Sequence, residues 1–351
     1  MVDYGLMWGG CVLVKLVSVI IPVYNSERYI RACLDSVLSQ SLEDMEVVCI
    51  DDGSFDSSKE IIRGYLAADR RVQLLEQENR GAAAARNRGI QHAQGEFLAF
   101  MDADDLYPEP ATLQKLYQAA REHEVSVCGG SMGEFKTSAA RVITSWDDPY
   151  QDGYTFKAPG LIAYADYQFD FGWTRFIYKR SLLIDQGIQQ PECRYFEDPP
   201  FFVEALFAAG CFYAIPDITY LYRWNAGKNH ALSSAQAAMD ALAGVEHNIR
   251  FAHDKGYQRL FSISVHRLCD ILELIDTNDL TVVNRQLEIL DLLGSYPEAQ
   301  AQTAQYAKAL QWQFMDEKRM LSGLKLTRVS LFMARLRAYL KRRLGHARKD
   351  R

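Results

Sequence analysis

The chain has 351 residues, of which 48% are hydrophobic and 24% are charged, so it can bury one large core or two modest ones. Its seven cysteines are scattered, without the paired spacing of a zinc site or a CxxC motif, which argues against a disulfide framework and favours a reducing, cytoplasmic setting. No apolar run is long enough to span a membrane, and the start lacks the pattern of a signal peptide. We therefore expect a soluble globular protein in which residues 1–16 are an extension before the first strand.

Strand and helix patterns alternate along the first 130 residues. Strands are expected at 17–22, 46–50, 71–75, 97–101 and 125–128, with helices at 27–40, 57–66, from 81 onward, and at 108–124. Repeated β-α units imply an α/β fold with a mostly parallel sheet flanked by helices, and ligands bind at the carboxyl ends of such strands. Beyond residue 235 the pattern predicts only helices, at 235–256, 260–275, 282–293 and 297–317.

The net charge of −6 is unevenly distributed. Residues 325–351 contain ten Lys or Arg and one acid, and their apolar residues recur mostly at spacings of three to five, as in a basic amphipathic helix. Such a helix is typical of attachment to an anionic membrane surface. Packing on the protein body and RNA binding are the alternatives. The acidic remainder of the chain, which has no interleaved basic and aromatic face, argues against a nucleic-acid-binding protein.

Three carboxylates follow the strand expected at 97–101, namely Asp102, Asp104 and Asp105. Carboxylates so close together repel one another unless a hard cation neutralises them, and Mg²⁺ or Mn²⁺ prefers oxygen ligands and bridges to phosphates. The pattern therefore indicates a divalent metal site. The alternative is a solvated turn that leads to Pro108.

Two further polar clusters follow earlier strands, at 22–25 and 51–54. If the strands are parallel, all three clusters lie at one edge of the sheet. Asp51 or Asp52 can accept a hydrogen bond from a nucleobase imide or a ribose hydroxyl. Arg86, in the first turns of a helix, can help to neutralise a diphosphate or, alternatively, pair with the acidic edge.

Four segments match, in order and spacing, the nucleotide-sugar domain of family 2 glycosyltransferases with the GT-A fold. They are VSVIIPVYN from Val17, VCIDDGSFDSS from Val48, ENRGAAAARNRGI from Glu78 and GEFLAFMDADD from Gly95. Ordered motifs over about ninety residues are far more specific than any one of them alone. The resemblance implies a nucleotide-sugar donor, a UDP-sugar above all, and a Mn²⁺ or Mg²⁺ cofactor.

The polar clusters and the resemblance together indicate which side chains bind the donor and the metal. Donor contacts are expected from residues at the strand ends, from the helix after residue 81 and from a later Tyr-Arg segment: Pro22, Tyr24, Asn25, Asp51, Asp52, Arg86, Asp102, Arg223 and Lys228. Metal ligands are expected at Asp104, Asp102 and His230. Arg223, Lys228 and His230 belong to or follow the segment Tyr220-Leu221-Tyr222-Arg223-Trp224, whose spacing to Ser233 is longer than the commonest pattern of the family.

An acidic pair, Glu197 and Asp198, stands before a hydrophobic helix, where the positive helix end keeps carboxylates ionised. An attacking sugar hydroxyl must lose its proton, which a carboxylate within reach can accept. Simple N-capping by Asp198 is the alternative. The segment FEDPPFF resembles the Glu-Asp motif of the family, which implies that Asp198 is the catalytic base and that Glu197 holds the acceptor or orients the site. Trp173 can stack on an acceptor ring or be a core residue.

These features predict a metal-dependent, inverting glycosyltransferase that acts on a saccharide or lipid-linked saccharide acceptor in cell-surface polysaccharide synthesis, at the inner face of the membrane. The GT-A domain is expected at 17–234, with the donor side at 17–130 and the acceptor side and base at 131–234, followed by a helical region at 235–351. A non-catalytic nucleotide-sugar-binding partner is the competing prediction, although it would not need Asp198. A dinucleotide oxidoreductase is excluded because no Gly-rich turn follows the first strand. No motif specifies the sugar or an oligomeric state.

Overall fold

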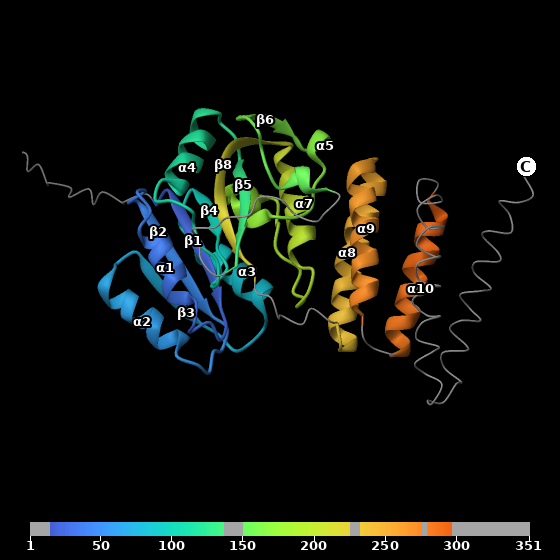
Figure 1. Cartoon of the computed structure of the whole chain (residues 1–351), viewed down its shortest axis with the longest axis horizontal. Coiled ribbons are helices and arrows are strands. Elements are labelled where there is room, and N and C mark those ends of the chain that lie inside the picture. Colours follow the sequence, from blue (N-terminus) through green and yellow to red (C-terminus); the bar gives the residue numbers. More distant parts are fainter. Residues whose placement is uncertain (1–14, 137–149, 225–231, 276–278, 297–351) are drawn as a thin grey trace, which may run out of the picture. The chain divides into compact units, whose positions relative to one another are not determined.

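The computed structural model describes residues 15–136, 150–224, 232–275 and 279–296, and the chain divides into two compact units, residues 1–228 and 229–351 (Figure 1). The strands are β1 (Val17–Val23), β2 (Met45–Asp51), β3 (Val72–Glu76), β4 (Phe97–Phe100), β5 (Val127–Phe135), β6 (Gly160–Ala163), β7 (Phe176–Lys179) and β8 (Cys211–Arg223). The helices of the first unit are α1 (Ile30–Leu38), α2 (Ser58–Ala68), α3 (Ala82–His92), α4 (Thr112–Glu122), α5 (Tyr164–Tyr167), α6 (Arg180–Asp185) and α7 (Asp198–Ala209), with short 3₁₀ helices at Gln151–Gly153 and Trp173–Arg175. The second unit contains α8 (Ala235–Lys255), α9 (Gln258–Leu274) and α10 (Leu280–Ser295).

The eight strands form one sheet in the order β3-β2-β1-β4-β7-β5-β8-β6. The first four strands of this order are parallel, β5 is parallel to β8, and β7 and β6 are antiparallel to their neighbours. The predicted α/β fold, with a mostly parallel sheet and a helical C-terminal region, is confirmed. The strand expected at 125–128 is longer in the structure, and the later strand β7 separates it from β4.

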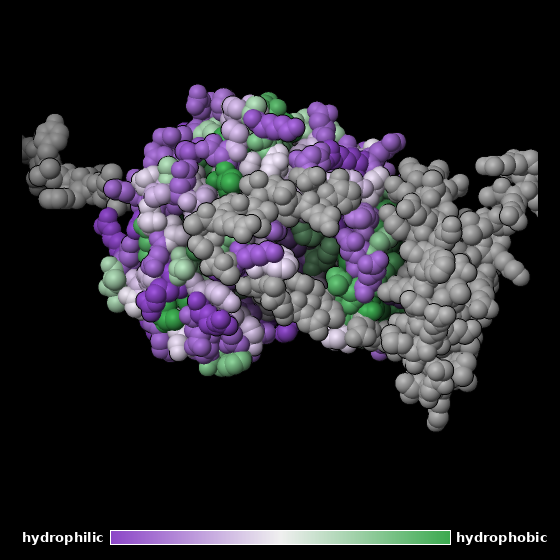
Figure 2. Space-filling model, in the orientation of Figure 1, coloured by the Kyte–Doolittle hydropathy of each residue, from purple (hydrophilic) through white to green (hydrophobic). Residues whose placement is uncertain are grey.

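Continuous apolar runs form the centre of the sheet because helices cover both of its faces. Every residue of β2 is buried, as is nearly every residue of β1. Gly89 allows α3 to pack closely on these strands, since a Cβ at this position would lie 2.4 Å from Cγ2 of Ile20. The close approach fixes α3 against the sheet and thereby places Arg86. The surface of this unit shown in Figure 2 is mainly hydrophilic, with hydrophobic side chains scattered over it.

The second unit is a set of packed helices in its described part. Ser234 caps α8 by accepting a hydrogen bond from the Ala237 N–H at 3.1 Å, and α8 packs against both α9 and α10. The helices expected at 235–256, 260–275 and 282–293 are confirmed to within a few residues. The helix expected at 297–317 and the basic segment at 325–351 lie outside the described residues. None of the described helices combines the length and the apolar character that crossing a bilayer requires.

Candidate active site

The predicted polar clusters lie at one edge of the sheet. β1 is parallel to β2 and β4, and its last residue, Val23, pairs with Asp51 at the end of β2. Asn25 ties the two following loops together: its backbone N–H donates to Ser54 Oγ at 3.1 Å, and its Oδ1 accepts from the Phe55 N–H at 3.0 Å. The loops after β1 and β2 therefore form one continuous surface.

Two exposed aromatic rings stand on this surface. Tyr24 is 47% exposed and Phe55 is 83% exposed, and their rings meet edge to face with centroids 6.1 Å apart. The face of an exposed ring can receive a planar base. Pro22, at the end of the same strand, is half-buried.

The adjacent acids Asp51 and Asp52 have different surroundings. Asp52 accepts hydrogen bonds from the backbone N–H groups of Arg80 and Gly81, at 2.9 and 2.8 Å, and from Gln77 Nε2 at 2.8 Å. Gly81 has φ +93°, a conformation that favours glycine, and α3 starts at the next residue. Asp52 thus organises the turn before α3. The buried Asp51 accepts from the Ser54 N–H at 3.3 Å and lies 3.6 Å from Lys59 Nζ, which leaves it spare acceptor capacity.

The three acids after β4 are not equivalent. Asp105 is fully buried and accepts hydrogen bonds from the Tyr220 hydroxyl and the Arg223 backbone N–H, both at 2.6 Å. Burial, followed by the charges of Asp102 and Asp104, raises the pKa of Asp105 well above its usual range. Asp105 therefore fastens the acidic turn to β8, whereas Asp102 and Asp104 are half-buried carboxylates at the edge of the sheet.

Arg223 braces the same turn from the end of β8. Its Nε donates to the backbone carbonyl of Asp104 at 2.6 Å, and its guanidinium lies over the rings of Tyr29 and Phe135 at 5.1 and 4.4 Å. Lys228 and His230, which were predicted to act beside it, lie outside the described residues.

Arg86 joins the two acidic parts of the site. Its Nη2 lies 2.7 Å from Asp102 Oδ1, its Nη1 lies 3.1 Å from Glu197 Oε1, and its guanidinium lies over the Trp173 ring at 5.0 Å. Burial alone lowers the pKa of Arg86, but the charges of the two carboxylates outweigh it and raise the pKa above its ordinary value. The structure therefore shows the acid-paired alternative for Arg86, and this pairing brings the turn after β4 next to the start of α7.

The acidic pair lies at the first turn of α7. Glu197 occupies the N-cap position, and no side chain caps the helix. Pro199 and Pro200 follow, and they lack the N–H groups that a capping side chain would bond. The capping role considered for Asp198 is therefore not observed. Burial, followed by the charge of Glu197, raises the pKa of Asp198 to about 7, although Arg86 opposes the rise. The expectation that the helix end keeps this carboxylate fully ionised is therefore wrong, because burial outweighs it.

The backbone before the acidic pair is strained. Phe196 has φ +64°, in the left-handed region that bulky side chains rarely adopt. Its ring meets Phe171 edge to face at 6.1 Å, and this contact helps to hold it there. Strain of this kind tends to occur at functional sites, where the surrounding structure fixes an otherwise unfavourable conformation.

Trp173 is 4% exposed and packs against Phe100 and Phe201, with ring centroids 4.8 and 5.3 Å away. Trp173 was predicted either to stack on an acceptor ring or to be a core residue, and in the structure it lies in the core beneath Arg86. So little of the indole is exposed that it offers almost no surface to an acceptor ring in this structure.

Sequence reasoning missed the neighbours that fix Arg86. Asn87 donates from Nδ2 to the Gln190 carbonyl at 2.7 Å and accepts from the Gln190 N–H at 2.9 Å, and Gln190 Oε1 accepts from Arg86 Nη1 at 3.0 Å. More than a hundred residues separate the partners, so no spacing rule connects them. The one available signal was a polar Asn at a buried position of a helix that is otherwise rich in alanine.

The two carboxylates after β4 have the right chemistry for a metal. Within the described part of the chain, no three His, Cys, Asp or Glu side chains are grouped as a complete metal site. Mg²⁺ is commonly held by only one or two carboxylates together with substrate phosphates and water. Asp102 and Asp104 therefore fit a cation that binds together with a diphosphate, rather than one held by protein ligands alone.

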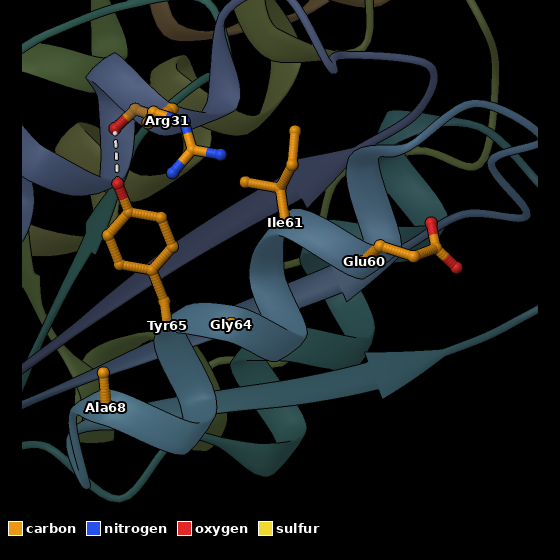
Figure 3. A pocket seen from close by; sticks show the side chains of 6 residues that line it. All are labelled: Arg31, Glu60, Ile61, Gly64, Tyr65 and Ala68. Carbon is orange, nitrogen blue, oxygen red and sulfur yellow. Dashed lines mark hydrogen bonds between the residues drawn. The ribbon is translucent and has the colours of Figure 1, made fainter.

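A separate hollow of about 510 Å³ lies between α1 and α2. In Figure 3 the Arg31 side chain from α1 lies across from Tyr65 and Gly64 of α2, and the Tyr65 hydroxyl donates to the Arg31 carbonyl at 3.4 Å. The hollow shares no residue with the acidic edge of the sheet, so we do not assign it to the active site.

Comparison with known proteins supports a family 2 glycosyltransferase. Residues 18–184 match the model of Glycosyl transferase family 2. EpsJ, an uncharacterized glycosyltransferase of Bacillus subtilis (strain 168), is 32% identical over 223 residues, which cover 61% of this chain and 62% of EpsJ. The minor teichoic acid biosynthesis protein GgaA of the same organism is 30% identical over 225 residues, covering 59% of this chain and 46% of GgaA. The matches thus span less than two thirds of either relative.

Solved structures agree on the fold. The crystal structure of S. aureus TarS 1-349 in complex with UDP-GlcNAc superposes with a TM-score of 0.64 at 21% identity, covering 82% of this chain and 83% of that one. The predicted GT-A type of α/β fold is confirmed.

Proposed function

We propose that the protein is a metal-dependent, inverting glycosyltransferase that moves a sugar from a UDP-sugar to a hydroxyl of a saccharide or lipid-linked saccharide. One observation carries the proposal: Arg86 bonds to Asp102 at the edge of the sheet and also to Glu197, the neighbour of Asp198. Arg86 thus connects the surface proposed for the donor with the segment that carries Asp198, whose pKa is raised to about 7.

The donor binds at the edge formed by the loops after β1, β2 and β4. The exposed rings of Tyr24 and Phe55 offer a face to the base, and Asp51 has acceptor capacity for its imide N–H or for a ribose hydroxyl. Asp102 and Asp104 would hold Mg²⁺ or Mn²⁺, which supplies positive charge against the diphosphate. Arg223 keeps the acidic turn in place from β8.

Asp198 acts as the general base. The acceptor hydroxyl oxygen forms a bond to the anomeric carbon, the bond from that carbon to the diphosphate breaks, and the hydroxyl proton passes to the Asp198 carboxylate. A single displacement of this kind inverts the anomeric configuration. A base whose pKa lies near the working pH is well matched to this transfer, and the charge of Glu197 helps to keep it there.

A surface-glycopolymer acceptor is supported by the name of one relative, the minor teichoic acid biosynthesis protein GgaA. A hydroxyl-rich polymer is also consistent with a site that depends on a general base. Attachment to the membrane through 325–351 remains a prediction from the sequence.

The test combines ligand binding with a base variant. UDP, GDP, CDP, TDP and their sugars are screened by thermal shift with and without Mn²⁺, starting with UDP-GlcNAc, and we expect stabilisation by UDP compounds that requires the metal. Asp198→Asn should lower turnover by about 10²–10⁴-fold while donor stabilisation persists. Asp185→Asn, which makes the same change at an exposed position, is the control. Binding without turnover in the wild type would instead support a non-catalytic nucleotide-sugar-binding partner.

A further inference from the structure

Gln190 is held beside the catalytic centre by its own backbone. It lies in the segment between α6 and α7, is 2% exposed, and both its N–H and its carbonyl are bonded by the side-chain amide of Asn87, at 2.9 and 2.7 Å. Asn87 lies on α3, next to Arg86. This pair of bonds fixes residue 190 relative to the helix that carries Arg86.

The side chain of Gln190 takes part in the Arg86 interactions. Its Oε1 accepts from Arg86 Nη1 at 3.0 Å, and the same nitrogen donates to Glu197 Oε1 at 3.1 Å. A guanidinium has donors and no acceptor, so this bond identifies which end of the amide is the oxygen. Gln190 therefore helps to determine where Arg86 Nη1 lies in relation to Glu197.

The other end of the amide has no partner. Nε2 of Gln190 is buried without a hydrogen bond to any described residue. Buried N–H groups are nearly always bonded in folded proteins, and an exception calls for a physical reason. Because Nε2 and Oε1 share one carbon atom, the unpaired donor lies next to the ion pair between Arg86 and Glu197. An oxygen acceptor that binds at this centre would satisfy it.

We propose that Gln190 is a positioning and specificity residue for sugar transfer. Its Oε1 orients Arg86 toward Glu197, and its Nε2 donates a hydrogen bond to a hydroxyl oxygen of a sugar. A neutral amide suits a neutral hydroxyl, whereas the charge of a diphosphate is met at Asp102 and Asp104 by a cation. This inference rests on the proposed transferase activity, and the hydroxyl belongs either to the sugar of the donor or to the acceptor.

Two variants and a matched control separate these roles. Gln190→Leu removes both polar ends, Gln190→Glu keeps an acceptor for Arg86 but removes the donor, and Gln189→Leu makes the same change at the exposed neighbouring position. We expect Gln190→Leu to lower kcat about 10- to 100-fold, because a misplaced charged group costs that much in positioning. Gln190→Glu should retain more of kcat while raising one KM about tenfold, and Gln189→Leu should match the wild type.

The substrate whose KM rises identifies the source of the hydroxyl. If it is the donor, calorimetry should also show weaker binding of UDP-GlcNAc to Gln190→Leu, with unchanged binding of UDP. If it is the acceptor, both nucleotides should bind as in the wild type and only the acceptor KM should rise. The inference is overturned if both Gln190 variants keep wild-type kcat and KM values, even with lowered stability, since Gln190 would then be structural and Nε2 would be bound to water. Absence of transfer and of nucleotide binding in the wild type would refute the proposed function instead.

Discussion

Replacing Glu197 with Gln should move the pH dependence of the reaction to lower pH. The pKa of Asp198 is raised to about 7, first by burial and then by the charge of Glu197. A base must be unprotonated, so the wild-type kcat/KM should fall about tenfold for each pH unit below this value. Glu197→Gln removes the like charge and also takes from Arg86 a partner at 3.1 Å, so both changes lower the pKa of Asp198.

A nearby charge shifts a carboxylate pKa by about 1–3 units. Because Glu197 is already paired with Arg86, its effect on Asp198 is partly offset. We therefore expect a pKa shift at the lower end of this range, about 1 unit. At about pH 6 the wild type would then retain about a tenth of its own plateau kcat/KM, and the variant about half. Each profile is normalised to its own plateau because the lost ion pair also affects the plateau.

The control is Glu192→Gln, which removes the same charge from an exposed ion pair with Arg80, 2.8 Å apart. The midpoint pH of its kcat/KM profile should stay at the wild-type value. If the midpoint pH does not move in Glu197→Gln, or moves equally in Glu192→Gln, this account of the Asp198 pKa is refuted.

The raised pKa of Asp198 should also make the free energy of unfolding depend on pH. Between the usual aspartate value of about 3.9 and the raised value of about 7, the native state holds a proton that the unfolded state has lost, so the free energy of unfolding falls as pH rises through this window. Asp198→Asn removes the ionisable group and with it this loss of stability. Because the side chain is only half-buried, we expect the free energy of unfolding to rise on the order of 2 kcal/mol at about pH 8 and hardly at all at about pH 4. Urea unfolding at both pH values measures it, and an equal effect at both would contradict the raised pKa.

Three further outcomes follow from the contacts of the site. Asp104→Asn should abolish the metal-dependent part of donor binding in calorimetry, and persistence of that part would place the cation elsewhere. Arg86→Lys should lower turnover by about 100-fold and the free energy of unfolding by about 2 kcal/mol in urea titrations, because an ammonium cannot bond to Asp102 and Glu197 in the same fork geometry. Phe196→Gly should be more stable than Phe196→Ala by about 1 kcal/mol, since both lose the ring but only glycine relieves φ +64°, and the reverse order would argue against strain.

Local patterns were enough to predict the first half of the fold. In β1, β2 and β4 the apolar run ends at or near the end of the strand, so the polar residues that come next mark the strand ends. The place of β7 between β4 and β5 was not predictable, because strand order depends on pairing between segments far apart in the chain. For the same reason, nothing near Asp105 distinguishes it from Asp102 and Asp104, since its partner Tyr220 is 115 residues away.

The balance of charge at the centre supports the proposed metal dependence. Arg86 is the one cationic side chain that bonds to Asp102 and Glu197 in the described structure, and Asp198 lies beside Glu197. Two carboxylates are already paired to this single guanidinium, and burial, followed by the charge of Glu197, raises the pKa of Asp198 in spite of Arg86. A diphosphate would add more negative charge at the same edge of the sheet, where Asp104 also lies. The side chains that bring the base close to the donor surface are thus the ones that would repel a donor arriving without a metal ion.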